Sequence, residues 1–501
     1  MASLGLARAL GRHAERAMLR ASDAPLSRGN AARLLVDGPE TFASWLEQIE
    51  RAERWIHLEN YVLRNDRTGR LFRDALAERA RAGVRVRVLY DWMGCWATPK
   101  RFWSPLRTAG ADVRAFAPPS LRFPLDFMRR DHRKVLAVDG EYASVGGMCI
   151  GDEWAGDPDA GIPPWRDTGV EFRGPVAGVI DRAFARTWAA AGSALPDDEI
   201  PDPHGIPRHG DVTVRVVEGE PGRSRIYRLS QLVSVGVERR LWITDPYFVA
   251  PPAMNESLAS AARDGVDVRI LVPAYNNWPI IGGMSRAGYQ YLLEAGVRLF
   301  EWEGPMIHAK TTVADGLWSR VGSTNLNLAS LLGNWELDVV VLDRKFAADL
   351  EALFLRDLSS AVEVKLHDSA VSHSGRRFQR EAFDVGLHGE PVSTNPMDLS
   401  SARSARQRAR RGSRVGRVLG RLARAGSVLG RALLGQPVVG RSDSGWILAL
   451  SVLLLLVAVL GFWAPRVLAW PIAFLAFWLS VASLFRALPH IGRRRPPGEK
   501  R

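Results

Sequence analysis

The sequence predicts an α/β protein with two tandem copies of one domain and a C-terminal two-helix transmembrane hairpin. Three observations predict it: a repeated order of helix and strand patterns over residues 31–368, a polar motif present in both copies, and two charge-free apolar runs near the end of the 501-residue chain. The resulting division is an N-terminal segment, two domains, a linker, the hairpin and a tail, with bounds at 1–30, 31–205, 206–368, 369–444, 445–487 and 488–501.

The N-terminal segment, residues 1–30, is predicted to form a basic amphipathic helix and not a signal peptide. Arginine recurs at every fourth position from Arg8 to Arg20 and interrupts any apolar core. A more apolar stripe that includes Leu6 and Leu10 runs beside these arginines. Two interpretations stay open here: the helix rests on an anionic membrane surface, or it is solvated and has no partner.

Helix-period and strand-period patterns alternate in both predicted domains. The first domain shows them at Phe42–Arg54, Trp55–Leu63, Gly69–Ala82, Ala82–Asp91 and Ala109–Phe116. The second domain repeats this order at Arg228–Val237, Leu241–Val249, Ser257–Asp264, Asp264–Pro273 and Ala295–Trp302. Such alternation indicates βαβ units, and we expect a largely parallel sheet flanked by helices in each domain, with the two related by a pseudo-two-fold axis.

Each domain carries the pattern H-x-K-x4-D once. Its members are His132, Lys134 and Asp139 in the first domain and His308, Lys310 and Asp315 in the second. The chain has only six lysines, and two of them occupy this motif. Because residues i and i+2 of a strand share a face, each histidine projects beside its lysine.

Paired imidazoles and ammonium groups suit the transfer of a phosphoryl group. One imidazole can attack phosphorus and the other can protonate the departing alcohol, while the two lysines neutralise charge on the non-bridging oxygens. No metal and no cofactor is required. We expect Asp139 and Asp315 to orient a histidine across the pocket, and Ser323 and Asn325 to contact phosphate.

Two apolar runs near the C-terminus, Trp446–Trp463 and Val467–Phe485, are each long enough to cross a bilayer. Pro465 breaks the helix between them, and basic residues flank the pair on both outer sides, which places both ends in the cytoplasm. A helical hairpin buried in a soluble core is the alternative.

Positive charge is concentrated before this hairpin. The formal net charge is +13, and residues 401–441 hold eleven arginines and no acidic residue. Such a segment attracts anionic lipid or nucleic acid, and the adjoining hairpin favours lipid, so we expect a membrane partner and no nucleic acid. The two cysteines, Cys95 and Cys149, favour a reduced compartment.

The paired motif resembles that of the phospholipase D superfamily, a tandem H-x-K-x4-D with a downstream G-S-x-N. Further segments, Trp165–Pro175 and Asn334–Val341, resemble the bacterial cardiolipin synthase branch. The resemblance covers residues 31–368. It implies one active site between the two phospholipase D-like domains, a phosphatidyl-histidine intermediate, and carboxylates that orient the opposite histidine, at Asp167 and Glu336.

By the same resemblance, His132 is the nucleophile and His308 the general acid and base, although the residues alone do not separate these roles. Gly147 belongs to the phosphate-contacting set, at a position where the wider superfamily has Ser. Cys149 stands where the family usually has Asn, which removes an amide from the first half of the pocket.

The leading hypothesis is a cardiolipin synthase-type transfer of a phosphatidyl group between two phosphatidylglycerol molecules, with release of glycerol. The enzyme would lie in the inner membrane with its catalytic domains on the cytoplasmic side. Three alternatives stay open: a phospholipase D hydrolase or broad transphosphatidylase, a metal-independent nuclease, and a non-catalytic lipid-binding scaffold. The oligomeric state and the accepting alcohol are not predicted.

Overall fold

The computed structural model describes residues 13–119, 129–367 and 370–377, and five single helical positions between 470 and 481. The first twelve residues, nearly all of the predicted linker and hairpin at 369–487, and the tail at 488–501 therefore lie outside the described residues. No helix within the described part of the chain combines the length and apolar character needed to cross a membrane.

The first half contains one seven-stranded sheet. Its spatial order is β1 (Leu26–Val36), β8 (Thr168–Arg173), β7 (Tyr142–Gly146), β6 (Lys134–Val138), β2 (Trp55–Asn60), β3 (Arg85–Asp91) and β4 (Asp112–Phe116). The helices of this half are α2 (Asp37–Arg51), α3 (Arg67–Arg81), α4 (Ser104–Thr108), α5 (Asp152–Ala155) and α6 (Pro175–Ala190).

The second half repeats this order and adds two strands. Its sheet runs β9 (Val212–Gly219), β15 (Asn334–Leu342), β14 (Trp318–Gly322), β13 (Thr311–Ala314), β10 (Arg240–Thr244), β11 (Asp267–Pro273), β12 (Arg298–Trp302), β16 (Ala361–His367) and β17 (Ala370–Arg377). Its helices are α7 (Arg225–Gly236), α8 (Pro252–Arg263), α9 (Pro279–Ala287), α10 (Tyr289–Glu294) and α11 (Arg344–Leu358).

The expectation of a largely parallel sheet was wrong. Only β2, β3 and β4, and their counterparts β10, β11 and β12, pair in parallel, while every other pairing within the two described sheets is antiparallel. The cause is local, because the motif strands β6 and β13 are each followed by a tight hairpin to β7 or β14. The helix and strand patterns predicted from the sequence do reappear as α2 to β4 and α7 to β12.

An Asp-Gly pair forms each of these hairpin turns. Asp139 and Gly140 both have positive φ, 55° and 73°, and Asp315 and Gly316 have φ of 51° and 65°. Two successive positive φ values define the type I′ turn that fits the twist of a hairpin, and Asp-Gly is a preferred pair for it.

The side chain of each turn aspartate is bound by the backbone that precedes a parallel strand. Asp139 accepts hydrogen bonds from the backbone N–H groups of Glu53, Arg54 and Trp55 at 2.8 Å. Asp315 accepts three equivalent bonds at 2.9 Å from residues 238–240. The expectation that these aspartates orient a histidine across the pocket is therefore wrong, because each lies at the far end of its motif strand and holds the sheet together there.

Replacing Asp139 by alanine is expected to lower stability while leaving catalysis intact below the melting temperature. The change removes three hydrogen bonds to a carboxylate and puts alanine at positive φ, for an expected loss of about 1–3 kcal/mol of unfolding free energy. Asp139→Asn is the matched control, because asparagine tolerates this φ and keeps one acceptor oxygen. Thermal unfolding and kcat at low temperature check this, and a selective loss of kcat in a fully folded Asp139→Ala protein would restore a catalytic role.

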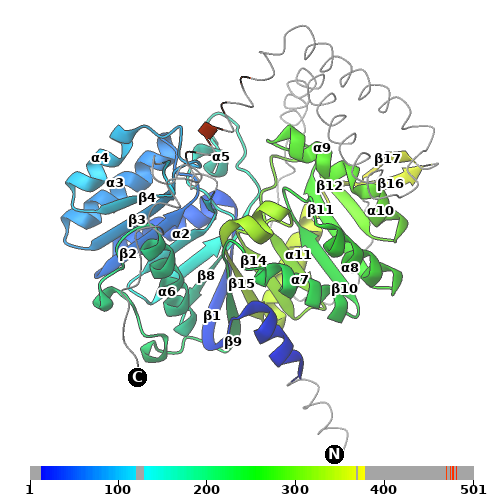
Figure 1. The fold of residues 1–501 in the computed structure, drawn as a ribbon, viewed down its shortest axis with the longest axis horizontal. Helices are drawn as coiled ribbons and strands as arrows, with labels where there is room; N and C mark the ends of the chain where they lie inside the picture. The colour runs from blue at the N-terminus through cyan, green and yellow to red at the C-terminus, as the bar shows by residue number, and fades with distance from the viewer. Residues whose placement is uncertain are drawn as a thin grey trace, which may run out of the picture.

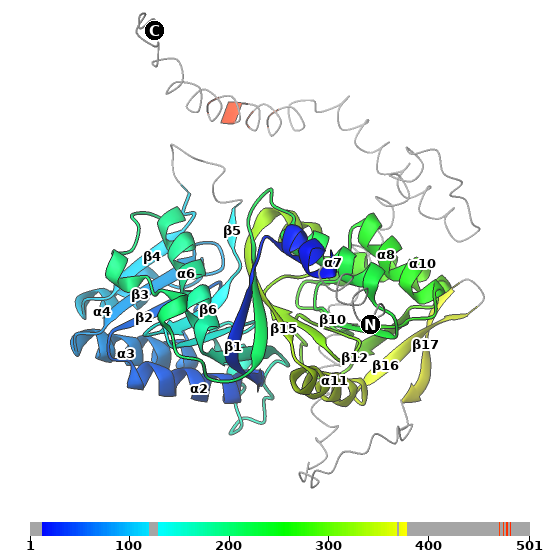
Figure 2. The ribbon, with the colours of Figure 1, turned by 90° about the horizontal axis from the view of Figure 1, so that it is seen from below.

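The two halves lie side by side with their sheets continuous through β1 (Figures 1 and 2). Strand β1 pairs with β8 at Ala31–Val36 and with β9 at Leu26–Asn30, so the predicted boundary at residue 31 falls inside a strand that serves both sheets. Helices α6 and α11 pack between the halves, where one hydrophobic cluster contains residues of both, such as Ile180 and Leu350. A rigid junction therefore holds one half against the other.

The described part of the N-terminal segment packs on the second half. Residues 13–22 are helical, Met18 contacts the hydrophobic cluster of that half, and Glu15 forms an ion pair of 2.8 Å with buried Arg215. Arg16 and Arg20 stay exposed. Neither interpretation of the segment included this packing, which uses Glu15 and Met18.

Candidate active site

The two histidine–lysine pairs lie at the start of strands β6 and β13, at the edge where the parallel strands end. Asn60, the last residue of β2, pairs with Lys134, and Thr244, the last residue of β10, pairs with Thr311 directly after Lys310. The backbone around the histidines is extended and crosses between the halves. His132 N–H donates to Trp335 O at 2.9 Å, and His308 N–H donates to Arg166 O at 2.7 Å.

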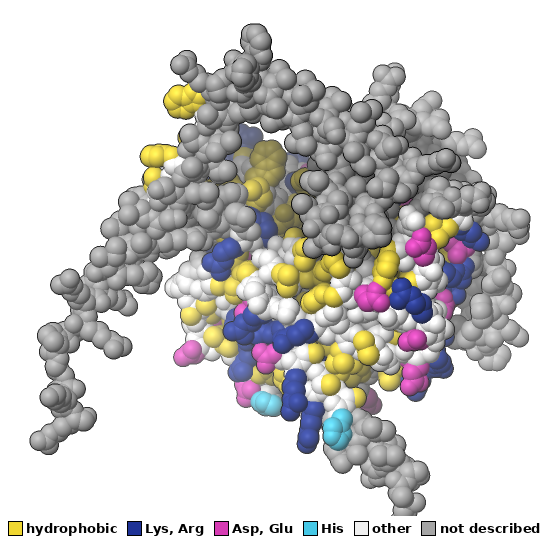
Figure 3. Space-filling view, turned by 45° about the vertical axis from the view of Figure 1, so that its right-hand side comes forward, with side chains coloured by type: hydrophobic (Ala, Val, Ile, Leu, Met, Phe, Trp, Pro, Cys, Tyr) yellow, Lys and Arg dark blue, Asp and Glu magenta, His cyan; other side chains and the backbone are white. Residues whose placement is uncertain are grey.

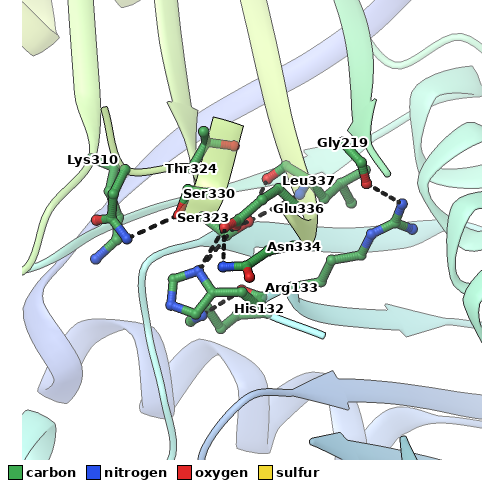
Figure 4. A network of polar contacts seen from close by, with 12 residues as sticks. His132, Arg133, Gly219, Lys310, Ser323, Thr324, Ser330, Asn334, Glu336 and Leu337 are labelled. Carbon is green, nitrogen blue, oxygen red and sulfur yellow. Dashed lines mark hydrogen bonds and ion pairs between the residues drawn. The ribbon is translucent and has the colours of Figure 1, made fainter. Parts of the chain in front are cut away.

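Each histidine is bound by a carboxylate of the opposite half, where the resemblance placed it. His132 Nδ1 lies 3.0 Å from Glu336 Oε2, and His308 Nδ1 lies 2.7 Å from Asp167 Oδ2. Figure 4 shows the His132 ring facing the Glu336 carboxylate, whereas Arg133 extends away toward Gly219. Adjacent residues therefore point to opposite sides, as the sequence pattern predicts.

Further donors fix both carboxylates. Glu336 accepts from Ser323 Oγ at 2.5 Å and from Asn334 Nδ2 at 3.2 Å. Asp167 accepts from Trp154 Nε1 at 3.0 Å and from the Thr168 N–H at 2.8 Å. Both carboxylates are fully buried, and each is held in place by groups of its own half.

The electrostatic balance keeps both imidazoles neutral and both carboxylates charged. Burial and the Lys310 ammonium lower the pKa of His308 to about 3, and burial with Lys134 lowers the pKa of His132. Burial alone would raise the pKa values of Asp167 and Glu336, but their histidines and the lysines lower both. A charged carboxylate only accepts hydrogen bonds, so each Nδ1 carries the proton and each Nε2 has a free lone pair.

Both lysines lie inside the same site. Lys134 and Lys310 are fully buried, and each donates to the backbone carbonyl of the histidine two residues before it. Lys310 Nζ also lies 2.9 Å from His308 Nε2. Beside the effect of burial, Lys134 of the first half lowers the pKa of His308 in the second half, and Lys310 lowers the pKa of His132. Each lysine therefore acts on the histidine of the opposite half, and the two pairs form one site.

The positions that the sequence predicts to contact phosphate differ between the halves. Ser323 donates to Glu336, whereas a Cβ at Gly147 would lie 2.1 Å from Asp167 Oδ1. The shorter Asp167 thus requires glycine at this place, and the longer Glu336 leaves room for serine. Asn325 is buried with its Nδ2 on Ser330 Oγ at 3.3 Å, while Cys149 is buried and its pKa is raised by that burial.

Replacing Gly147 by alanine is expected to disable the site by displacing Asp167. A Cβ at 147 would lie 2.1 Å from Asp167 Oδ1, 2.8 Å from its Cγ and 2.9 Å from its Oδ2, so the whole carboxylate, including the oxygen on His308, must shift. A shift of about 1 Å costs about 10²-fold in rate. Ser323→Ala is the matched control, since it removes the hydrogen bonds of the Ser323 hydroxyl with Glu336 and Leu337 but adds no atom. The ratio of the two kcat values tests the argument, and equal losses in both variants would contradict it.

Several site residues escaped the sequence analysis. The Tyr61 ring centroid lies 4.8 Å from that of His132, and Tyr247 and Trp154 lie against His308 at 5.9 and 5.4 Å. The signal available for Tyr61 and Tyr247 was their matched place in the segments that follow β2 and β10. Each tyrosine also lies under the ammonium of the lysine of its own half, at 5.0 and 5.7 Å.

Arg166, which positions the site through the backbone, was missed as well. Its carbonyl receives the His308 N–H, and its guanidinium binds Asp357 of α11 at 2.9 Å and Asp37 at 3.3 Å. Arg166 therefore positions the segment that carries Asp167 against the second half. Within the described ranges, no group of three or more His, Cys, Asp or Glu side chains is arranged to hold a metal ion.

Comparisons with known proteins agree with this arrangement. A family model described as cardiolipin synthase, PLD-like domain, matches residues 45–153 and 236–358. A cardiolipin synthase A of Pseudomonas putida (strain W619) is 34% identical over 72% of this chain and 74% of that protein. A cardiolipin synthase of Geobacillus sp. (strain WCH70) is 34% identical over 68% of this chain and 69% of its own length.

A solved structure supports the fold independently of close sequence similarity. The phosphatidylserine synthase of Haemophilus influenzae Rd KW20 superposes with a TM-score of 0.56 at 15% identity, covering 70% of this chain and 92% of that one. The fold, the cross-paired histidines and the sequence relatives therefore lead to one assignment: this chain belongs to the cardiolipin synthase family of proteins with phospholipase D-like domains.

Proposed function

We propose that this protein transfers the phosphatidyl group of one phosphatidylglycerol to a second, releasing glycerol and forming cardiolipin. One observation carries the proposal: two buried histidines, each with its Nδ1 within hydrogen-bond distance of a carboxylate of the opposite half, lie beside two buried lysines. Membership in a family whose curated relatives are named cardiolipin synthases supports the choice of phospholipid as substrate.

His132 is the proposed nucleophile. In the described part of the chain no side chain donates to its Nε2, whereas His308 Nε2 is bound by Lys310 at 2.9 Å. The free lone pair of His132 attacks phosphorus, the phosphorus–oxygen bond to the headgroup glycerol breaks, and a phosphatidyl-histidine forms. Glu336 stabilises the positive charge that develops on the His132 ring.

His308 is the proposed general acid and base. The incoming phosphate anion binds Lys310 and draws this ammonium from His308, so Nε2 of the neutral ring takes up a proton from water while Nδ1 keeps its own proton on Asp167. That proton goes to the leaving glycerol oxygen. A hydroxyl of the second phosphatidylglycerol then returns a proton to His308, attacks phosphorus and breaks the bond to His132 Nε2. When cardiolipin leaves, Lys310 returns to His308 and the ring gives its extra proton back to water, which restores the free enzyme.

The lysines are proposed to bind the non-bridging phosphate oxygens. Burial lowers the pKa of Lys310 to about 8, so the group is charged at neutral pH and loses its proton above that value. Charge on the phosphate oxygens grows in the transition state, where a buried ammonium stabilises it most.

The activity of the free enzyme is therefore expected to decline above about pH 8, as Lys310 becomes neutral. Lys310→Arg is expected to move this alkaline decline to higher pH, since a guanidinium stays charged, even where kcat itself falls. The pH dependence of kcat/KM reports the free enzyme and measures this directly. A decline at the same pH in both proteins would assign it to another group.

The membrane assignment is also a proposal. The runs at 446–463 and 467–485 would form the transmembrane hairpin, with the catalytic halves on the cytoplasmic side of the inner membrane and the arginines of 401–441 on anionic lipid. The domain bounds 31–205 and 206–368 remain proposed as functional units, with β1 shared by both sheets.

A product assay tests the proposed reaction. Full-length protein is incubated in detergent with phosphatidylglycerol labelled in the acyl chains and in the headgroup, and the products are separated. Cardiolipin and free glycerol in equal amounts support the transferase. Phosphatidic acid in place of cardiolipin would make the enzyme a phospholipase D, and the absence of any turnover would reject the reaction.

A further inference from the structure

We propose that the loops around the mouth of the site form a surface that enters the headgroup region of an anionic lipid bilayer. This inference rests on the proposed phospholipid chemistry of the site and adds how its substrate reaches it. We call this surface the rim. Its apolar members are the exposed side chains Trp96, Ile162, Tyr275, Trp278, Leu328 and Leu332.

All of these side chains come from segments at one edge of the sheets, and this is the edge at which the candidate active site lies. Trp96 follows β3, and Tyr275 and Trp278 follow β11, so they leave the carboxyl ends of the parallel strands, where β2 meets Lys134. Leu328 lies three residues beyond Asn325. In Figure 1, α5 and α9, which lie beside these segments in the chain, project from the same end of the molecule.

The exposure of the aromatic residues is the main evidence. Trp96 is 74% exposed, Trp278 61% and Tyr275 60%, the three highest values for aromatic side chains in the two described halves. Apolar patches of this kind on a protein surface mark sites of interaction. Trp and Tyr side chains prefer the interface between water and lipid, because their rings are apolar and their N–H or O–H groups stay hydrated.

The charges beside the rim fit an anionic surface. Lys100 and Arg101 are exposed four and five residues after Trp96, and exposed Arg129 lies three residues before His132. The acidic side chains Asp152 and Glu153 near the mouth are each within ion-pair distance of an arginine. Figure 3 shows hydrophobic side chains lying among charged ones on the side of the second half.

A bilayer fits this position better than a protein partner. His132 is 8% exposed and His308 5%, so a lipid must descend past the rim to place its phosphate between them. A protein seated on the rim would close that path, whereas a bilayer supplies both the donor and the acceptor lipid through it. The apolar surface of the rim also shelters the acyl chains as a headgroup enters the site.

The first test measures depth in the membrane and needs no turnover. Trp96→Cys, Trp278→Cys and the control Val235→Cys are made in the full chain, labelled with an environment-sensitive dye and placed in vesicles of phosphatidylglycerol and phosphatidylcholine. Val235 is 78% exposed at the end of α7, away from the rim, and the native Cys95 and Cys149 are buried. The unsubstituted protein measures any labelling of these two.

Acyl-chain nitroxide lipids are expected to quench the dye at 96 and 278 and to leave the dye at 235 unquenched. Equal quenching at all three positions, or none at 96 and 278, would overturn the proposal. The dye at 96 and 278 is also measured without vesicles at several protein concentrations. If its fluorescence changed with protein concentration there, the proposal would be overturned and the rim would be assigned to contact between copies of the chain.

The second test measures catalysis. The double variant Trp96→Ser/Trp278→Ser is expected to lose about tenfold in turnover on vesicles and to keep turnover on short-chain phosphatidylglycerol dissolved as monomers, with Val235→Ser as control. An equal loss on both substrates would overturn the inference. If the unsubstituted protein turns over no lipid, the proposed function fails, while the quenching result still decides whether the rim meets a membrane.

Discussion

Alanine at His132 or at His308 is expected to reduce phosphatidyl transfer by about 10⁴-fold or more, with no loss of folding. His132→Ala removes the atom that bonds to phosphorus, and His308→Ala removes the group that protonates the leaving glycerol. Both rings lie at the edge of the sheets and not in a hydrophobic cluster, so the substitutions leave the packing intact.

The double variant gives this prediction its sharpest form. Because the two histidines act in the same step, His132→Ala/His308→Ala is expected to be no slower than either single variant. His209→Ala, an exposed histidine outside the site, is the control and is expected to match the unsubstituted protein. Additive losses, or activity within tenfold of normal in either single variant, would show that the histidines do not share one reaction.

Replacing either carboxylate by its amide is expected to cost about 10³–10⁴-fold in kcat with little change in KM. Glu336→Gln and Asp167→Asn keep the shape of the side chain, but an amide offers an N–H to His132 or His308 and favours the tautomer with its proton on Nε2. That tautomer has no lone pair for attack, and a neutral amide does not stabilise the imidazolium.

A control from the strand that follows Asp167 separates this effect from a loss of stability. Glu171, four residues after Asp167 on β8, binds Arg33 at 2.7 Å and Ser44 at 2.5 Å, away from both histidines. Glu171→Gln is expected to keep kcat within a few fold. If Asp167→Asn and Glu171→Gln lowered kcat equally, the carboxylates would have a structural role only.

The sequence predicted the centre of the site well because a single rule governs it. Side chains at i and i+2 of an extended chain share a face, and that rule placed His132 with Lys134 and His308 with Lys310. The cross-pairing with Asp167 and Glu336 came from the family resemblance. Spacing alone contains no information about which half of the chain faces which histidine.

The error over Asp139 and Asp315 has a physical origin. An aspartate close to a histidine and a lysine in the sequence suggests a catalytic group, yet the glycine after it is equally strong evidence for a type I′ turn. The turn reverses the chain, so the aspartate ends at the opposite end of its strand from the histidine. The same turns make β7 and β14 antiparallel to their motif strands, which the helix and strand patterns did not show.

Contacts between distant residues account for what else was missed. Arg166 binds Asp357, 191 positions further along the chain, and β1 pairs with strands of both halves. The requirement for glycine at 147 depends on the length of the Asp167 side chain twenty positions later. Each of these depends on how the halves pack, and one sequence without its relatives gives no measure of that packing.

Trapping the covalent intermediate tests the central claim most directly. Full-length protein is mixed with phosphatidylglycerol labelled in the phosphatidyl phosphate, quenched in alkali within one turnover, digested and examined by mass spectrometry. The account predicts label on His132, retained in alkali as expected for a phosphorus–nitrogen bond and absent from His132→Ala. Label on any other residue, or full turnover in which no labelled residue ever forms, would contradict it.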